Sequence, residues 1–173
     1  MKLLLFLTLM LCPLLTFSEV RAETAKAILN GTTPQVPVEG EAIFEETQEG
    51  LKVSIEFKKA PAGLHGIHIH ENGSCEDGGK AAGDHFNPEG APHGFLLEGG
   101  LTRAHAGDFG NIEIREDGTG TLKLTFKEIS LNGRYGVVGR SVILHEKADE
   151  FIQPLGNAGS RIGCGSIEMI ENA

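Results

Sequence analysis

Short runs of hydrophobic residues alternate with polar ones along most of the chain, and a period of two residues indicates β-strands. The alternation is clearest over residues 51–57 and 122–126. Further strands are expected at residues 25–29, 38–46, 112–114, 137–144 and 164–169. No stretch has the spacing of a long amphipathic helix. The pattern therefore predicts an antiparallel β-sandwich or barrel.

Tight turns separate the expected strands, and many of the 24 glycines fall in them. The clearest is Asp117-Gly118-Thr119-Gly120, which lies between the apolar positions of 112–114 and 122–126. Glycine adopts the positive φ angles that tight turns require, so we expect a hairpin here. Two longer segments, residues 71–111 and 146–163, carry no strand pattern. Both contain histidine or aspartate, and long loops in a compact domain are commonly functional.

The N-terminus has the features of a secretory signal peptide. Lys2 precedes an apolar run over residues 3–17. The residues at 20–22 are ones that are tolerated before a signal-peptide cleavage site, and they end at Ala22. The run is too short for a comfortable membrane span. We expect cleavage after Ala22, which leaves one mature domain over residues 23–173 and no membrane association once residues 1–22 are removed.

The chain is acidic, with a formal net charge of −9 at pH 7. Cleavage would remove Lys2, Glu19 and Arg21, which leaves 15 − 2 = 13 basic and 24 − 1 = 23 acidic residues and a net charge of −10. A negative charge of this size favours solubility and disfavours binding to nucleic acid, which is also negative.

The cysteines bear on the compartment in which the protein works. Cys12 lies in the expected signal peptide, and the bulky Leu11 before it disfavours a lipid anchor. Cys75 and Cys164 remain as an even pair in a chain bound for an oxidising compartment, and we expect them to form a disulfide. The alternative is two free thiols or thiolate metal ligands, which requires a reducing compartment or a nearby thiolate cluster.

Three histidines fall within one expected strand that precedes the first long loop. Side chains of a strand alternate between its two faces. His65 therefore shares the core face with Ile67 and Ile69, whereas His68 and His70 point to the other face. We interpret His65 as a buried structural histidine bonded to backbone groups, and His68 with His70 as a chelating pair.

The first long loop supplies a further set of polar residues. The set consists of His85, His93, His105 and Asp108. Three imidazoles and one carboxylate complete a tetrahedral zinc site of the structural kind. His145 ends an apolar strand farther along the chain, so six of the seven histidines lie off the core face. We interpret the chain as a protein with two metals, with scattered surface histidines as the alternative.

Five segments together resemble the copper/zinc superoxide dismutase family, in the family's order and over essentially the whole mature chain. They are Gly63-Leu64-His65-Gly66-Ile67-His68-Ile69-His70-Glu71, His85-Phe86-Asn87-Pro88, His105-Ala106-Gly107-Asp108-Phe109-Gly110-Asn111, Gly139-Arg140 followed by His145-Glu146-Lys147-Ala148-Asp149, and Gly156-Asn157-Ala158-Gly159-Ser160-Arg161 with Cys164-Gly165. The resemblance implies an all-β fold: an eight-stranded antiparallel Greek-key β-barrel or sandwich with two long functional loops.

The resemblance also implies a role for each site residue. Copper would be held by His68, His70, His85 and His145. Zinc would be held by His85, His93, His105 and Asp108, with His85 as the bridge between the metals. Asp149 resembles the carboxylate that links His68 to His93, and such partners orient the rings of metal ligands. Arg161 resembles the arginine that holds the anionic substrate beside copper.

The implied activity is the dismutation of superoxide to oxygen and hydrogen peroxide. Copper would cycle by one electron, and zinc would be structural, with one ion of each metal per chain. The alternative is a non-enzymatic domain that stores or transfers copper and zinc. A missing copper ligand or a missing Arg161 would favour that alternative, and neither is missing. The resemblance leaves open a monomer or a homodimer. We expect a secreted protein, periplasmic if the source is a Gram-negative bacterium.

The chain also departs from the eukaryotic pattern of the family. Cys75 follows His70 by only five residues, which resembles bacterial members, and the stretch between His93 and His105 is longer. Residues 150–155 lack the charged side chains that eukaryotic members place near the copper channel, and Leu155 replaces a threonine. We expect these changes to leave metal ligation intact and to alter charge steering and dimer geometry.

Overall fold

β-Strands make up most of the regular structure in the computed structural model, which describes residues 23–171. The strands are β1 (Thr24–Gly31), β2 (Glu39–Thr47), β3 (Gly50–Lys59), β4 (Gly63–His70), β5 (Asp108–Ile114), β6 (Gly120–Phe126), β7 (Ser141–His145), β8 (Arg161–Ser166) and β9 (Glu168–Met169). The expected signal peptide, residues 1–22, lies outside the described residues.

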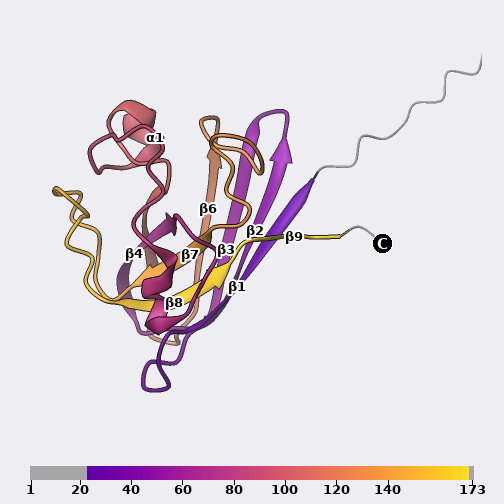
Figure 1. Cartoon of the computed structure of the whole chain (residues 1–173). Coiled ribbons are helices and arrows are strands. Elements are labelled where there is room, and N and C mark those ends of the chain that lie inside the picture. The colour runs from indigo at the N-terminus through magenta and orange to yellow at the C-terminus, as the bar shows by residue number, and fades with distance from the viewer. Residues whose placement is uncertain (1–22, 172–173) are drawn as a thin grey trace, which may run out of the picture.

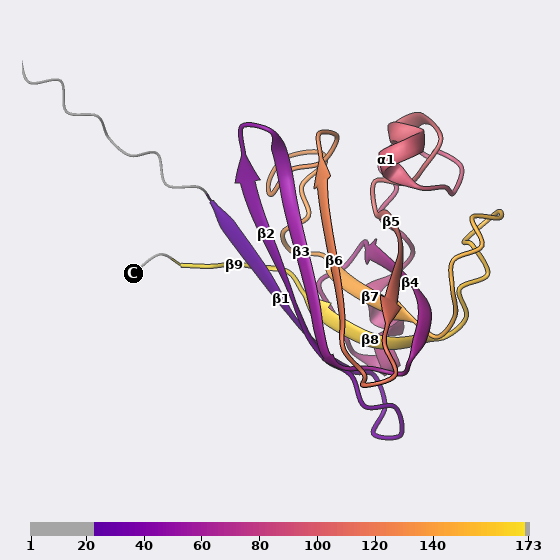
Figure 2. The same cartoon turned by 180° about the vertical axis from the view of Figure 1, so that it is seen from behind.

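The strands form a closed antiparallel barrel with Greek-key connections. Their order is β2-β3-β6-β5-β4-β7-β8-β1, and β1 also pairs with β2, which closes the barrel. The connections from β3 to β4 and from β6 to β7 each pass over two intervening strands. The short β9 adds to β1. Figures 1 and 2 show β2, β3 and β6 on one side of the barrel and β4, β7 and β8 on the other. The expected eight-stranded barrel is confirmed.

The alternating pattern of the sequence accounts for the core. Leu51, Val53, Ile55 and Phe57 of β3 all point inward and are at most 3% exposed, while the polar residues between them face outward. The expected hairpin also forms, since β5 and β6 pair across residues 115–119. Burial of these apolar side chains is the main source of stability in a fold with so little helix.

Two expected strands have different boundaries in the structure. The strand expected at 137–144 begins only at Ser141, because the backbone of the preceding residues is bonded to the loop before them. The strand expected at 164–169 is divided into β8 and β9 at Ile167, whose N–H donates to the carbonyl of Arg140 at 2.8 Å. Hydrophobicity does not distinguish an apolar turn from an apolar strand, so the sequence pattern missed both breaks.

The two irregular segments are slightly shorter than expected. The first loop spans residues 71–107, because β5 already begins at Asp108, and it contains the short helices η1 (Asp77–Ala82), α1 (Leu96–Gly99) and η2 (Gly100–Thr102). The second loop spans residues 146–160, because β8 begins at Arg161. No helix within residues 23–171 is long and apolar enough to cross a membrane.

The disulfide between Cys75 and Cys164 is present, with the two Cα atoms 5.7 Å apart. It fastens the first loop to β8. The loop is therefore tied covalently to the side of the barrel that carries the histidines of β4 and β7, and free thiols or thiolate ligands are excluded for this pair.

Candidate metal centre

The histidines of β4 divide between the two faces as the strand period predicts. His65 points to the core side, where Nδ1 lies 2.8 Å from the carbonyl oxygen of His145 and Nε2 lies 2.9 Å from that of Pro61. This confirms His65 as a structural histidine bonded to backbone groups. His68 and His70 point to the other side, where the two loops bury them to 0% and 1% exposure.

The strand pairing is irregular beside two of the candidate ligands. The pairing of β4 with β5 shifts register between Gly66 and His68, and that of β7 with β8 shifts between Leu144 and His145. A bulge rotates the local backbone and re-aims a side chain. Beside these irregularities the rings of His68 and His145 come close together, with their centroids 4.8 Å apart.

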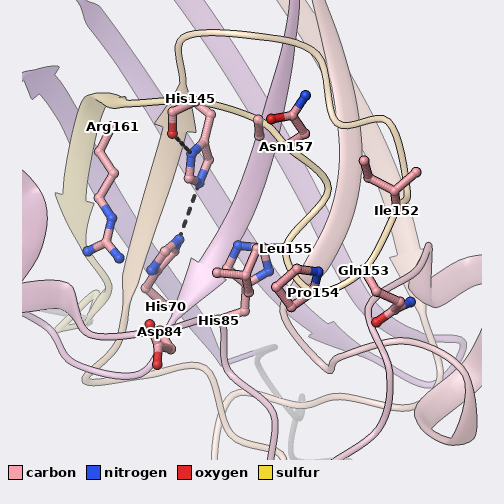
Figure 3. Close-up of a pocket in the computed structure, with 12 residues that line it drawn as sticks. His70, Asp84, His85, His145, Ile152, Gln153, Pro154, Leu155, Asn157 and Arg161 are labelled. Atoms are coloured by element: carbon pink, nitrogen blue, oxygen red, sulfur yellow. Dashed lines mark hydrogen bonds between the residues drawn. The ribbon is translucent and has the colours of Figure 1, made fainter.

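Four buried histidines form the first cluster. They are His68, His70, His85 and His145, and one ring nitrogen of each lies within 4.8 Å of one from every other. The Nε2 atoms of His70 and His145 are 3.4 Å apart, and a dashed line joins these two rings in Figure 3. This is the set that the family resemblance implies for copper, and the fold brings all four together from β4, the first loop and β7.

The second cluster shares His85 with the first. It consists of His85, His93, His105 and Asp108, all buried. The Nδ1 atoms of the three histidines lie 2.9, 3.0 and 3.2 Å from the carboxylate oxygens of Asp108. The fold therefore also gathers the whole set assigned to zinc, and it places His85 between the clusters.

The outward nitrogen of each first-cluster histidine other than His85 is occupied by a hydrogen bond. His68 Nε2 lies 2.8 Å from Asp149, His70 Nδ1 lies 2.9 Å from the carbonyl of Gly83, and His145 Nδ1 lies 3.3 Å from that of Gly159. All three partners are hydrogen-bond acceptors, so the outward ring nitrogens carry the hydrogen. The opposite ring nitrogens are therefore left with lone pairs that face the cluster. Such outer partners fix the tautomer that a metal ligand needs.

Two buried ring nitrogens, His68 Nδ1 and His93 Nδ1, make no hydrogen bond of good geometry within the part of the chain that the structure describes, although His93 Nδ1 lies 3.0 Å from an Asp108 oxygen. An unpaired buried polar atom costs free energy. One of these nitrogens belongs to each cluster. The donor groups of the two clusters are imidazoles and one carboxylate, which are suitable ligands for copper and zinc. The residues present therefore fit two bound metal ions, which would satisfy these atoms.

Asp149 joins the two clusters, because its carboxylate oxygens lie 2.8 Å from His68 Nε2 and 2.9 Å from His93 Nε2. The side chain of Asn111, in β5, holds the backbone of Asp149 through two hydrogen bonds. The Asn111 amide N–H donates to the Asp149 carbonyl at 2.9 Å, and the Asn111 amide oxygen accepts from the Asp149 N–H at 2.7 Å. Sequence reasoning assigned no role to Asn111, although it ends the motif that contains His105 and Asp108.

Gly156 is required beside Asp149. Its φ is +72°, and a Cβ there would collide with the Asp149 carboxylate and with His93. Only glycine adopts this conformation readily and leaves that space empty. The close approach of the backbone to the Asp149 carboxylate therefore explains why position 156 is glycine.

Burial favours the neutral form of three cluster histidines, whereas a fourth, His93, favours the protonated form. Burial lowers the pKa of His70 to about 2 and that of His145 to about 3, and burial also lowers the pKa of His85 to about 4 despite its bond to Asp108. The pKa of His93 is raised to about 9, because hydrogen bonds to two carboxylates outweigh the effect of burial.

The two aspartates of the centre have lowered pKa values. Burial by itself would raise the pKa of Asp108, but hydrogen bonds from the surrounding histidines hold that pKa far below its usual range. The pKa of Asp149 is lowered for the same reason. At neutral pH and without metal, His70, His85 and His145 are therefore neutral, His93 carries a proton and both aspartates are ionised. A metal cation that binds His93 would displace this proton.

An open cavity of about 350 Å³ leads from the surface to the first cluster. Arg161 lines it on one side, and Ile152, Pro154 and Leu155 of the second loop line it on the other (Figure 3). Arg161 is the one lysine or arginine among the described residues of this lining. Lys80 and Arg103, two basic residues of the first loop, are not part of it.

Arg161 is also tied to the first loop. Its guanidinium donates to the carbonyls of Gly79 and Gly83, both at 2.6 Å. The Gly83 carbonyl is the same one that accepts from His70. Arg161 therefore presents a positive charge to the cavity and braces the loop segment that orients His70.

Comparison with known proteins agrees with this geometry. The sequence profile of the copper/zinc superoxide dismutase family matches residues 38–167. An extracellular copper/zinc superoxide dismutase of Caenorhabditis elegans is 34% identical, with 98% of this chain and 79% of that protein covered. A copper/zinc superoxide dismutase of Deinococcus radiodurans is 36% identical, with 96% of this chain and all of that protein (100%) covered.

A solved structure shows the same likeness in three dimensions. The crystal structure of the clock protein EA4 matches with a TM-score of 0.76 and 33% identity, and the match covers 90% of this chain and 100% of that one. The fold, the two histidine clusters and the family profile agree, and this chain belongs to the copper/zinc superoxide dismutase family.

Proposed function

We propose that this dismutase binds copper through His68, His70, His85 and His145, and zinc through His85, His93, His105 and Asp108. The observation that carries the assignment is the pattern of hydrogen bonds around the rings. Gly83, Gly159 and Asp149 occupy the outward nitrogens, so the free lone pairs point into the clusters. His85 belongs to both sets, so it would help to hold both ions.

The reaction consumes two superoxide anions and two protons and yields one oxygen and one hydrogen peroxide. Copper supplies a centre that accepts one electron and returns it, whereas zinc has no redox chemistry. Arg161 attracts the anion into the cavity and orients it, because its guanidinium is positive at any working pH. The His85 ring lines the cavity, where it would pass a proton to the product.

Asp149 positions both metal sites in this proposal. One carboxylate accepts hydrogen bonds from a copper ligand and a zinc ligand, and loss of such partners commonly reduces metal affinity by about 10- to 100-fold. Ile152, Pro154 and Leu155 line the opposite wall of the cavity beside the neutral Gln153 and Asn157, so this wall contributes no charge to the attraction of superoxide.

We also propose that the chain is secreted, with residues 1–22 as the signal peptide and residues 23–173 as the mature domain. The name of the extracellular relative from Caenorhabditis elegans supports secretion, and the disulfide suits an oxidising compartment. In a Gram-negative source this compartment is the periplasm. The mature protein acts as a monomer or homodimer, and its acidic charge disfavours nucleic acid as a partner.

One purified sample tests the proposed function. The protein, loaded with both metals, should contain about one copper and one zinc ion per chain and should accelerate the decay of superoxide generated by pulse radiolysis. Chelation of copper should abolish the acceleration, and restored copper should return it. Full metal content without any acceleration of superoxide decay would favour storage or transfer of metal instead.

A further inference from the structure

Arg140, of the Gly139-Arg140 motif, has no role in the catalysis proposed above. Its side chain nevertheless touches two segments that flank candidate copper ligands. It lies just before β7 and is partly buried. Its guanidinium carbon sits 3.5 Å from the centre of the Phe86 ring. One N–H donates to the carbonyl of Glu71 at 2.9 Å, and another donates to the carbonyl of Gly136 at 2.8 Å.

These contacts are adjacent to the metal centre in the chain. Glu71 directly follows His70, and Phe86 directly follows His85. The backbone of Arg140 is itself fixed, because its carbonyl accepts from the N–H of Ile167 at 2.8 Å. The side chain therefore extends from a rigid position on the barrel to the residues next to two candidate ligands.

Phe86 is the centre of a closed set of backbone hydrogen bonds. Its N–H donates to the Ile69 carbonyl at 2.9 Å, the Ile69 N–H donates to the Gly107 carbonyl at 2.9 Å, and the Gly107 N–H donates back to the Phe86 carbonyl at 3.0 Å. Ile69 lies between His68 and His70, and Gly107 lies between His105 and Asp108. The backbone around Phe86 thus connects ligands of both metals.

Glycine is required at position 107 in this arrangement. A Cβ there would collide with the carbonyl of Ile69, so only glycine lets the three segments come this close. The Phe86 ring, which is 3% exposed, anchors the arrangement from one side, and the guanidinium of Arg140 covers that ring.

We propose that Arg140 is a positioning residue of the metal centre. Its planar guanidinium holds the Phe86 ring and the Glu71 carbonyl together, and thereby keeps His85 and His70 in the orientation that the metals require. A rigid, planar group is suited to stacking on a ring while it donates in its own plane, and lysine cannot replace it in this role. The inference rests on the proposed ligand assignment.

Two substitutions separate the geometry of this side chain from its charge. Arg140→Gln removes the charge and the stacking, whereas Arg140→Lys keeps the charge and removes the planar fork. Arg134→Gln is the matched control, because Arg134 lies on the same connection between β6 and β7 but is exposed and paired with Glu89. Each full-length protein is loaded with copper and zinc, and its metal content is measured.

The informative measurements are the electron paramagnetic resonance spectrum of bound Cu(II) and the rate at which a chelator removes copper. Outer partners of metal ligands commonly change affinity by about 10- to 100-fold, so Arg140→Gln should lose copper at least about tenfold faster and show an altered spectrum. Arg140→Lys should resemble Arg140→Gln, and Arg134→Gln should match the wild type. Amide exchange at Phe86 and Gly107 should also be faster in both Arg140 variants.

Unaltered spectra and copper loss within about twofold of wild type would overturn the proposal, as would full rescue by Arg140→Lys, which would assign the effect to charge. If Arg140→Gln does not fold, Arg140→Lys and Phe86→Leu give the same test, since loss of the ring removes the same contact. A wild-type protein that binds no copper would instead overturn the ligand assignment, together with this inference.

Discussion

Replacement of Arg161 tests how an acidic protein attracts an anion. Arg161→Ala removes the one lysine or arginine from the described lining of the cavity. It also removes the brace to Gly79 and Gly83, and the Gly83 carbonyl orients His70. Arg161→Lys separates the two effects, because lysine keeps a positive charge but lacks the two-armed donor geometry.

The size of the charge effect follows from Coulomb's law. A unit charge about 5 Å from superoxide, in a partly solvated cavity with an effective dielectric constant of about 40, contributes about 1.7 kcal/mol. Since about 1.4 kcal/mol corresponds to a factor of ten in rate, Arg161→Ala should be on the order of tenfold slower. Arg161→Glu should be slower still, and Arg161→Lys should stay within about threefold of wild type if charge dominates.

Pulse radiolysis at several salt concentrations, with metal content measured on each sample, is the assay. Screening shortens the Debye length from about 30 Å at 0.01 M to about 8 Å at 0.15 M. The wild-type rate should therefore fall with salt, and the rate of Arg161→Ala should fall less. An Arg161→Ala protein with full copper, an unchanged rate and an unchanged salt response would refute the reasoning and leave Arg161 as a brace alone.

Further predictions concern the metals, the disulfide and pH. His145→Ala should lose copper and activity but keep zinc, whereas Asp108→Asn should lose zinc first; equal loss of both metals in both variants would contradict separate sites. Reduction of Cys75–Cys164, which are separated by 89 residues, should lower the free energy of unfolding by about 4–5 kcal/mol in a denaturant titration; an unchanged midpoint would contradict this. Burial lowers the pKa of His70 to about 2, so its unfolded form binds more protons once the pH falls below about 6.5. The metal-free protein should therefore lose stability as the pH falls from about 6.5 toward 2, and a constant melting temperature over that window would argue against the burial effect.

Much of the fold was predictable because β-strands leave a local signature. The two-residue period of Leu51 to Phe57 identified β3 and its inward face, and the turn at 117–120 identified the hairpin of β5 and β6. Strand ends were less predictable. Val137 and Cys164 begin equally apolar stretches. Pairing ends near Ile167 because its N–H donates to the Arg140 carbonyl and its carbonyl accepts from the Gly139 N–H, and the local pattern does not reveal these bonds.

The candidate site was predictable only in part. The division of His65 from His68 and His70 follows from strand periodicity, and the structure confirms that His65 is bonded to backbone carbonyls. The ligand roles came from spacing and from resemblance, and they stay predictions for direct metal analysis. Asn111 was missed, because its bonds to Asp149 join residues 38 apart in sequence.

The sequence by itself determined the strand pattern, the acidic charge, the cysteine pair and the supply of imidazoles and carboxylates, because these depend on residue type and local period. Only the tertiary structure decided which ring nitrogen faces each cluster, since the outward partners Gly83, Asp149 and Gly159 come from loops that fold back over the barrel. It also decided that Arg161 faces both the cavity and the first loop, and that Arg140 reaches Phe86. The physical reason is that hydrogen-bond geometry and burial depend on contacts between distant segments, which closure of the barrel and packing of the two loops create.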